Sequence, residues 1–312
     1  MKAIIYGAGA LGCFFGARLQ QGGHDVTFIA RGAHLEALQR HGLRVESSSG
    51  DFCLEHVDAT SEIAHLTPAD LIFFAVKNYD VAASAAAMAG LVGPGTAILT
   101  VQNGVWAQPH LAAAFGAQRV LPGVVMMPAE IKEPGVIRTP AEAELGGITF
   151  GPYEGGSSEL GARMLAAFAQ SGVPATLSDD IWQSLWKKFI PLSSYAAITA
   201  ATRLNIGAIR ETEVTRALLK SLIGETASVA RASHGTVPGD AGQSAFDMLM
   251  GLPPHLHASM LGDLLRGRRI ELEWLSGEVI RRGRELGIAT PSHQFAYAVL
   301  APYANGRPEG SP

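Results

Sequence analysis

Three glycines near the amino terminus have the spacing that binds the pyrophosphate of a dinucleotide. Gly7, Gly9 and Gly12 form the pattern Gly-x-Gly-x-x-Gly. In this motif the first glycine permits a tight turn, the second lets the backbone approach the pyrophosphate, and the third lets a helix pack close to a strand. The helix that follows presents free N–H groups and the positive end of its dipole to the phosphate. Because the chain has 36 glycines, the spacing needs support from its context.

The segments on either side of these glycines supply that context. Residues 2–6 form a short apolar run typical of a buried strand, residues 10–21 are expected to form a helix, and residues 25–30 a second strand. An NAD site has Asp or Glu at the end of the second strand, whereas this chain has Arg31 followed by Gly32. An arginine at this position favours the 2′-phosphate of NADP. The alternative is that Arg31 is a solvated side chain at a strand end.

Two adjacent lysines, Lys187 and Lys188, offer acid–base chemistry on a helix expected to start near residue 181. On a helix their side chains point about 100° apart. The positions three, four and seven residues from Lys188 form an apolar stripe, made of Ile181, Leu185, Leu192 and Tyr195. Lys188 is therefore expected on the buried face, where desolvation lowers the pKa of an ammonium group and allows it to donate a proton near neutral pH. The alternative is that its charged end reaches solvent.

Polar residues also follow two later strands, expected over 70–76 and 96–101. Lys77 follows the first strand and Asn103 lies just beyond the second, where parallel strands present residues to a bound cofactor. Both are also common in turns, so a structural role is the alternative. Glu271 is expected in the first turn of a helix over 270–286. There it can complement the positive end of the helix dipole or face the same site as Lys188.

Composition narrows the function classes. The net charge of −4 gives no basic surface for nucleic acid. Cys13 and Cys53 are too few for a disulfide framework and lack the spacing of a zinc site. We expect no bound metal, no export signal and no membrane span, hence a cytoplasmic protein. Basic and acidic residues alternate from 266 to 285, a pattern typical of a solvated helix face.

The order of the expected elements predicts an α/β protein with two domains. Strands alternate with helices up to about residue 101, which indicates a doubly wound, Rossmann-type parallel sheet. Residues 43–57 are expected to form a hairpin, and the short β-rich pieces between 120 and 152 an antiparallel or mixed extension of the sheet. From residue 179 the pattern is all-helical, including a helix over 256–265. We therefore predict an NADP-binding domain over 1–178 and an all-α substrate and catalytic domain over 179–312.

Taken together in order, these motifs resemble a known family. They are GAGALG at residues 7–12, an arginine after the second strand, Val-Lys at 76–77, Gln-Asn-Gly at 102–104, Trp-x-Lys-Phe at 186–189, Ser-Met-Leu-Gly-Asp at 259–263, Gly-Arg at 267–268, and Glu271. The chain resembles the ketopantoate reductases, 2-dehydropantoate 2-reductases, over almost its whole length. The resemblance implies NADPH-dependent reduction of 2-dehydropantoate to pantoate, on the pathway to pantothenate.

The resemblance also implies roles for individual residues. Lys188 becomes the catalytic acid, Ser259 binds the substrate carboxylate, and Glu271 contacts the substrate hydroxyl and the cofactor ribose. The implied cofactor contacts are Gly7, Ala8, Gly9, Ala10, Leu11, Gly12, Arg31, Lys77, Asn103, Ala129 and Glu271.

The chain departs from the family pattern beyond the lysine. The family has asparagines four and eight residues after the catalytic lysine, whereas this chain has Leu192 and Ala196. Two alternatives therefore stand beside 2-dehydropantoate reduction: a reductase of another, more apolar 2-keto acid, and an NADP(H)-binding regulatory protein without turnover. The expected partner is a small 2-keto acid, with no nucleic acid and no membrane. A homodimer is one option for the chain itself.

Overall fold

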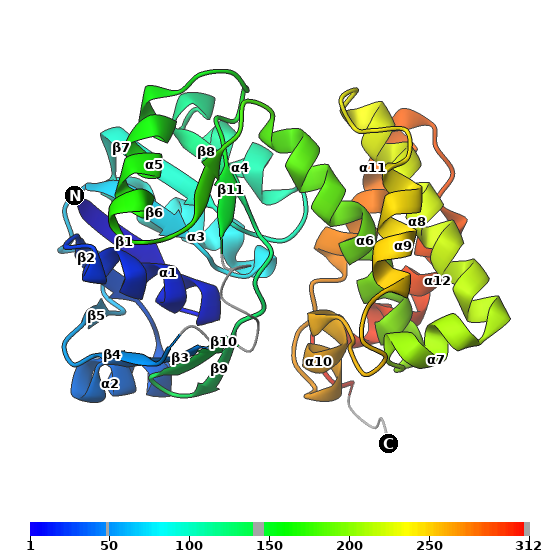
Figure 1. The fold of residues 1–312 in the computed structure, drawn as a ribbon, viewed down its shortest axis with the longest axis horizontal. Helices are drawn as coiled ribbons and strands as arrows, with labels where there is room; N and C mark the ends of the chain where they lie inside the picture. Colours follow the sequence, from blue (N-terminus) through cyan, green and yellow to red (C-terminus); the bar gives the residue numbers. More distant parts are fainter. Residues whose placement is uncertain (48–49, 140–146, 309–312) are drawn as a thin grey trace. The chain divides into compact units, whose positions relative to one another are not determined.

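The computed structural model describes residues 1–47, 50–139 and 147–308 (Figure 1). Contacts within the chain divide it into two compact units. Residues 1–102 and 107–181 form the first, and residues 103–106 and 182–312 form the second. The first contains all the described strands and is called the α/β unit; the second is called the helical unit. A Rossmann-like sheet followed by a helical region confirms the predicted fold class.

The main sheet of the α/β unit has eight strands in the order β12-β11-β8-β7-β6-β1-β2-β5. All neighbouring pairs are parallel except β11, which runs antiparallel to β8. The strands are β1 (Lys2–Tyr6), β2 (Asp25–Ile29), β5 (Asp58–Thr60), β6 (Ala69–Phe74), β7 (Val92–Thr100), β8 (Val120–Val125), β11 (Ile148–Phe150) and β12 (Ala175–Leu177). β1 is an interior strand between β6 and β2, with Ile4 paired to Thr27 on one side and Ile72 on the other. A continuous apolar run such as β1 suits a strand buried on both faces.

Among the described residues, five α-helices flank this sheet (Figure 1). They are α1 (Ala10–Gln21), α2 (Gly32–His41), α3 (Val81–Ala87), α4 (Ala107–Phe115) and α5 (Glu159–Gln170). Phe15 of α1 stacks on Phe73 of β6 with ring centroids 5.1 Å apart. The ring of Phe168 on α5 lies edge-on to Phe15 at 6.2 Å and to Phe150 at 5.7 Å. These aromatic contacts tie α1 and α5 to the sheet and make up much of the core of the α/β unit.

A second, four-stranded sheet has the order β4-β3-β10-β9. Its strands are β3 (Leu43–Ser47), β4 (Phe52–Leu54), β9 (Glu130–Glu133) and β10 (Val136–Thr139). The antiparallel pairing of β3 with β4 confirms the hairpin expected over 43–57. Residues 136–139 were expected to extend the main sheet, and this was wrong, because β8 already pairs with β7 and β11. β10 instead pairs in parallel with β3.

The helical unit contains no strand among its described residues. Its helices are α6 (Ile181–Thr202, whose first residue belongs to the α/β unit), α7 (Ile206–Glu211), α8 (Glu213–Ser233), α9 (Ala241–Met250), α10 (Ser259–Leu265), α11 (Glu278–Leu286) and α12 (Pro291–Leu300). α10 begins at Ser259, later than expected, because the chain first makes a turn in which the Leu256 amide donates to the Pro253 carbonyl. The helix expected over 270–286 begins with a π-helical turn, Glu273–Gly277, that continues into α11. In the part of the chain that the structure describes, no helix combines the length and hydropathy needed to cross a bilayer.

A buried histidine joins several helices of this unit. His293, at the start of α12, is fully buried and lies 2.8 Å from the Thr226 hydroxyl of α8 and 3.2 Å from the Ser276 hydroxyl of the π-helical turn. Thr226 in turn lies 3.2 Å from the Ser193 hydroxyl of α6. Burial lowers the pKa of His293 to about 4. The imidazole is therefore neutral near pH 7, and its contacts hold α6, α8 and the π-helical turn in one arrangement.

Candidate functional site

The glycine turn after β1 leaves no room for side chains at two of its positions. Gly7 has φ +104°, and a Cβ there would lie 2.8 Å from the Val76 amide nitrogen. A Cβ on Gly12 would lie 2.2 Å from the Gly7 carbonyl oxygen. At Gly9, by contrast, a Cβ would meet nothing within 4 Å. The turn is thus closed where strand and helix pack and open at the position from which a ligand approaches the backbone.

The amino terminus of α1 fits the phosphate groups of a dinucleotide. Gly9 is the N-cap residue of α1, and no side chain of its own caps the helix. The next residues, Ala10 and Leu11, are half-buried and uncharged. The N–H groups of the first turn and the helix dipole are therefore left to bind an anion. Together with the open space at Gly9, these backbone groups fit the pyrophosphate that the sequence motif predicts, whereas the amide of Ala8, also a predicted contact, donates to the Ile29 carbonyl at 2.9 Å.

Arg31 follows β2 and is the N-cap residue of α2. Its side chain is exposed, and its positive charge acts on the Tyr6 hydroxyl at the end of β1. Burial raises the pKa of Tyr6 above its ordinary value, and the nearby Arg31 charge partly opposes that rise. The structure thus places the Arg31 guanidinium close to the carboxyl ends of β1 and β2. This is the region in which a ribose 2′-phosphate binds in such folds.

The carboxyl ends of β6 and β7 are tied together by a side chain. Gln102 is buried, and its Nε2 donates to the Phe74 carbonyl at 2.9 Å and to the Val76 carbonyl at 3.0 Å. Gln102 therefore has a structural role next to the predicted cofactor contact Lys77, which is exposed. Ala129, the other predicted contact in this unit, is half-buried and lies between β8 and β9.

The segment after β7 belongs to the helical unit. The guanidinium of Arg282 on α11 donates to the Val105 carbonyl at 3.1 Å. The Trp106 ring lies edge-on to Trp274, with centroids 6.1 Å apart. At Gly104, where φ is +94°, a Cβ would lie 3.2 Å from the Trp274 carbonyl oxygen. Asn103, a predicted cofactor contact, therefore starts a segment that is fixed to the unit containing Lys188, Ser259 and Glu271.

The two lysines of α6 have different environments. Lys187 is exposed, and its Nζ lies 2.9 Å from the Gln183 Oε1 atom. Lys188 is half-buried, as the apolar stripe predicts. Burial lowers the pKa of Lys188 from 10.5 to about 8, and the negative charge of Glu271 opposes part of that change. Lys188 can therefore exchange a proton near neutral pH, which an ordinary lysine does poorly.

Glu271 is brought close to Lys188, since its charge acts on the pKa of that lysine. Its side chain is only 7% exposed. The residue lies just before the π-helical turn, and its carbonyl accepts hydrogen bonds from the Trp274 amide at 3.2 Å and the Leu275 amide at 3.1 Å. Ser259, the predicted carboxylate ligand, is the first residue of α10 and is exposed.

The two apolar residues at the positions where the family pattern has asparagines differ in their burial. Leu192 is half-buried, whereas Ala196 is 1% exposed. Between them, Tyr195 lies seven residues after Lys188, on the same face of α6. Its hydroxyl is buried and has no hydrogen-bond partner among the described residues. Burial raises the pKa of Tyr195 to about 12. The stripe that was read from the sequence as apolar thus includes a hydroxyl group that can still bond to a ligand.

One charged cluster near the site was not foreseen. The alternation of basic and acidic residues predicted a solvated face, yet Glu278 is only 2% exposed. Its carboxylate accepts hydrogen bonds from the Arg281 guanidinium at 2.7 Å and from Arg282 Nε at 2.6 Å. Arg282 also lies over the Trp186 ring, 5.4 Å from its centroid. The i,i+4 spacing of Glu278 and Arg282 is visible in the sequence, but the burial that fixes Arg282 on Val105 is not.

The described side chains were compared with the ligand sets of metal sites. Among residues 1–47, 50–139 and 147–308, no group of three or more His, Cys, Asp or Glu residues is arranged to hold a metal ion.

Two family models match the chain, one in each half. Residues 3–155 match the family described as ketopantoate reductase PanE/ApbA, and residues 180–304 match its C-terminal counterpart, ketopantoate reductase PanE/ApbA C terminal. The two matches cover the glycine turn, Arg31, Lys188 and Glu271.

Individual proteins resemble the chain over nearly its whole length. The 2-dehydropantoate 2-reductase of Mesorhizobium japonicum is 30% identical and covers 96% of this chain and 97% of its own. The crystal structure of a PanE/ApbA family ketopantoate reductase from Ralstonia eutropha is 33% identical, with a TM-score of 0.89 and coverage of 97% and 98%. A D-mandelate dehydrogenase with NADH and anilino(oxo)acetate, 21% identical, shares the fold with a TM-score of 0.86 and coverage of 97% and 98%. On these matches, the chain belongs to the ketopantoate reductase family of oxidoreductases.

Proposed function

We propose that the protein reduces a 2-keto acid to the corresponding 2-hydroxy acid with NADPH. The substrate that the family favours is 2-dehydropantoate, which gives pantoate for pantothenate biosynthesis. The observation that carries this proposal is the half-buried Lys188, whose pKa is lowered to about 8 beside the buried carboxylate of Glu271. A proton donor of this kind is what the reduction of a carbonyl group requires.

The cofactor is held by the α/β unit and by Asn103. The backbone from Gly7 to Gly12 binds the pyrophosphate, and Arg31 binds the 2′-phosphate, assisted by Lys77. Asn103, Ala129 and Glu271 complete the contacts. When bound, the nicotinamide supplies the hydride that the keto carbon accepts. The preference for NADPH over NADH is a testable part of this proposal.

The proton comes from the protein. Lys188 Nζ donates it to the keto oxygen as negative charge develops there, and the neutral amine is then reprotonated from solvent. Glu271 keeps the ammonium form populated near neutral pH, because its charge raises the pKa that burial lowers. Ser259, exposed at the start of α10, binds the substrate carboxylate.

The side chains on the Lys188 face of α6, which form one wall of the proposed substrate site, favour a more apolar substrate as the second candidate. Leu192 offers hydrocarbon where the family pattern has an amide, and Ala196 is buried. Tyr195 supplies the one hydroxyl on this face that lacks a partner in the described chain. A wall of this kind discriminates by only about 1–3 kcal/mol per methylene, less than a site built on hydrogen bonds to a substrate hydroxyl. Acceptance of several apolar 2-keto acids would fit this wall.

Steady-state oxidation of NADPH with a panel of 2-keto acids tests the proposal. The panel contains 2-dehydropantoate, straight-chain and branched 2-keto acids, and an aromatic 2-keto acid. Turnover of at least one of them identifies the reaction, and the ranking of kcat/KM identifies the substrate class. Tight binding of NADPH without turnover of any 2-keto acid would contradict the proposal and indicate a cofactor-binding regulatory protein.

A further inference from the structure

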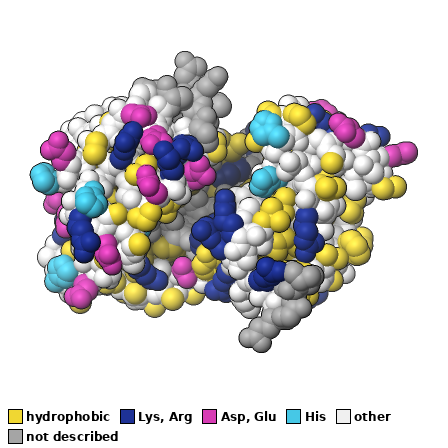
Figure 2. Space-filling view, turned by 90° about the horizontal axis from the view of Figure 1, so that it is seen from below, with side chains coloured by type: hydrophobic (Ala, Val, Ile, Leu, Met, Phe, Trp, Pro, Cys, Tyr) yellow, Lys and Arg dark blue, Asp and Glu magenta, His cyan; other side chains and the backbone are white. Residues whose placement is uncertain are grey.

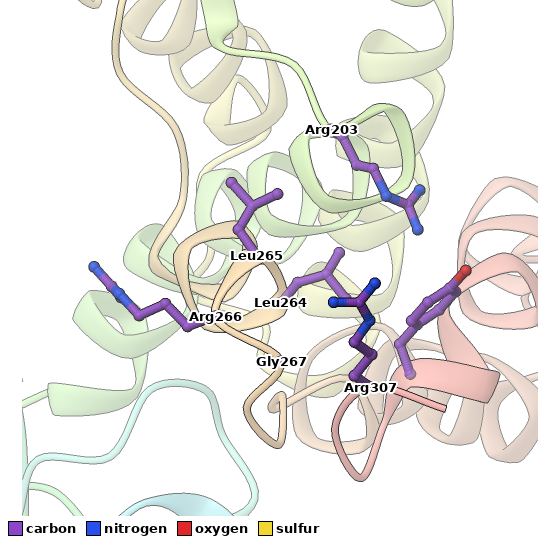
Figure 3. A pocket seen from close by; sticks show the side chains of 7 residues that line it. Arg203, Leu264, Leu265, Arg266, Gly267 and Arg307 are labelled. Atoms are coloured by element: carbon purple, nitrogen blue, oxygen red, sulfur yellow. The ribbon is translucent and has the colours of Figure 1, made fainter. Parts of the chain in front are cut away.

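His34 lies half-buried on α2, three residues after Arg31. Other histidine side chains lie at the surface, as on the face of the molecule seen in Figure 2. The hollow of about 650 Å³ shown in Figure 3 is lined by residues of the helical unit and does not involve His34. The His34 ring instead contacts α1, the glycine turn and the second sheet, all within the α/β unit.

The carbonyl group of Ala8, in the glycine turn, is held by two side chains. The Cys13 thiol donates to it, with Sγ 3.4 Å from the oxygen. Cys13 is fully buried, which raises the pKa of its thiol and keeps the proton on sulfur. The His34 ring also forms a hydrogen bond with the Ala8 backbone, and its Nε2 atom lies 3.4 Å from Cys13 Sγ. Since the Ala8 amide donates to the Ile29 carbonyl at 2.9 Å, the Ala8 carbonyl is the acceptor for His34.

The partners of His34 fix which ring nitrogen carries the hydrogen. The Gly135 amide donates to Nδ1 at 3.1 Å. A neutral imidazole has one donor and one acceptor nitrogen, so Nε2 carries the hydrogen that the Ala8 carbonyl accepts. Burial lowers the pKa of His34 below its ordinary value, and the bond to Ala8 opposes part of that change. The ring is therefore neutral near pH 7, and both of its nitrogens are used.

Gly135, which bonds to Nδ1, is itself fixed in place. It lies in the turn between β9 and β10 with φ +80°, and a Cβ there would lie 3.2 Å from the Ala37 Cβ atom of α2. Its carbonyl accepts a hydrogen bond from the Arg44 amide of β3 at 2.9 Å. The second sheet and α2 thus set the position of the His34 ring, and the ring holds the Ala8 carbonyl.

The orientation of the Ala8 carbonyl decides where the next amide points. No peptide bond in the described chain is cis, and in a trans peptide the C=O and N–H groups point in opposite directions. The Gly9 N–H therefore points away from His34. It donates to no other residue of the described chain, and a Cβ on Gly9 would meet nothing within 4 Å. This amide is left for a ligand on the side where the glycine turn is open.

We propose that His34 is a positioning residue for the pyrophosphate of the cofactor. Its Nε2–H, together with the Cys13 thiol, holds the Ala8 carbonyl, and the fixed peptide directs the Gly9 N–H at a phosphate oxygen. Without the His34 bond the peptide between Ala8 and Gly9 can rotate, and this donor is lost. The inference rests on the proposed binding of NADPH, and it is independent of which keto acid is reduced.

Two substitutions separate the two bonds of the His34 ring. In His34→Gln the side-chain amide donates from the place of Nε2, whereas in His34→Asn the amide oxygen replaces Nδ1 and no donor reaches Ala8. Binding of NADPH to the full-length protein is measured by calorimetry. His34→Asn should weaken it about tenfold or more, the loss expected for one hydrogen bond to a charged group, and His34→Gln should stay within about threefold of the wild type. The control is the same change at the exposed end of α2, His41→Asn, which should also stay within about threefold.

A cofactor fragment separates an effect on the pyrophosphate from a general disturbance of the site. Adenosine 2′-monophosphate carries the 2′-phosphate and no pyrophosphate, so His34→Asn should bind it as the wild type does. The inference alone is overturned if His34→Asn binds NADPH as the wild type does, if it loses the fragment as strongly as NADPH, or if His34→Gln loses NADPH as strongly as His34→Asn. A wild type that binds no NADPH overturns both this inference and the proposed function. Tight NADPH binding that depends on His34, without reduction of any keto acid, supports the inference and overturns only the proposed function.

Discussion

The most informative perturbation of this site is a change of pH. Lys188 has a pKa lowered from 10.5 to about 8. As the proton donor it is active when protonated, so reduction should be fastest below that pKa and should be lost as pH rises through it. One unit above a pKa, about a tenth of the groups keep the proton. An unperturbed lysine would remain almost fully protonated at the same pH.

We therefore expect kcat/KM for the keto acid to be constant below about pH 7, half of its plateau near pH 8, and about tenfold lower for each further unit. The assay is the initial rate of NADPH oxidation at saturating cofactor and limiting keto acid, in buffers of constant ionic strength. Lys187→Ala is the matched control and should keep the same profile, because Lys187 is exposed. A profile that stays flat to about pH 10, or a fall in kcat/KM near pH 8 that persists in Lys188→Arg, would refute the assignment of Lys188 as the proton donor.

Glu271 provides an independent check on the same profile. Its carboxylate raises the pKa of Lys188 against the effect of burial. Glu271→Gln removes that charge and keeps the shape of the side chain, so the fall in kcat/KM should begin at lower pH. If the fall in kcat/KM moves to higher pH, or does not move, the Glu271 carboxylate does not stabilise the charged form of Lys188.

Three further substitutions test other parts of the site. Arg31→Ala should remove most of the preference for NADPH over NADH, about 10- to 100-fold, because a charged contact to the 2′-phosphate is lost; equal affinities of the wild type for both cofactors would contradict this. Replacing Leu192 and Ala196 together by Asn should raise kcat/KM for 2-dehydropantoate relative to apolar 2-keto acids. If the wild type already prefers 2-dehydropantoate by several orders of magnitude, these two departures from the family pattern do not affect substrate choice. Glu278→Gln should lower the free energy of unfolding in urea by about 3 kcal/mol, because it leaves the charge of Arg282 unpaired in a largely buried contact; a loss under about 1 kcal/mol would mean that the pair is solvated.

Local patterns predicted the elements well. The strand Lys2–Tyr6 and the helix Ala10–Gln21 have the bounds that apolar runs and turn residues indicated. Such patterns reflect interactions between residues close in the chain. The pairing of residues 136–139 with β3 could not be predicted in this way. It depends on which sheet edges remain after distant strands have paired.

In the candidate site too, local sequence patterns predicted some features and not others. Helical phasing alone placed Lys188, and not Lys187, on the buried side, as the structure has it. The effect of Glu271 on that lysine was one of two alternatives, because a residue before a helix can serve the dipole or a neighbour. The contact of Arg282 with Val105 could not be predicted from the sequence. The same residue types at the same spacing form buried and solvent-exposed ion pairs. Tertiary burial, which decides between them, is not a local property.

The central claim is that Lys188 donates the proton to the substrate. Its most direct test is kcat for Lys188→Ala and Lys187→Ala with NADPH and the best 2-keto acid of the panel, with cofactor affinity and the urea midpoint measured in parallel. We predict that Lys188→Ala lowers kcat by about 10²- to 10⁴-fold with folding and NADPH binding unchanged, and that Lys187→Ala stays within about threefold of the wild type. Equal kcat values for the two variants, or a larger loss in Lys187→Ala, would contradict the account.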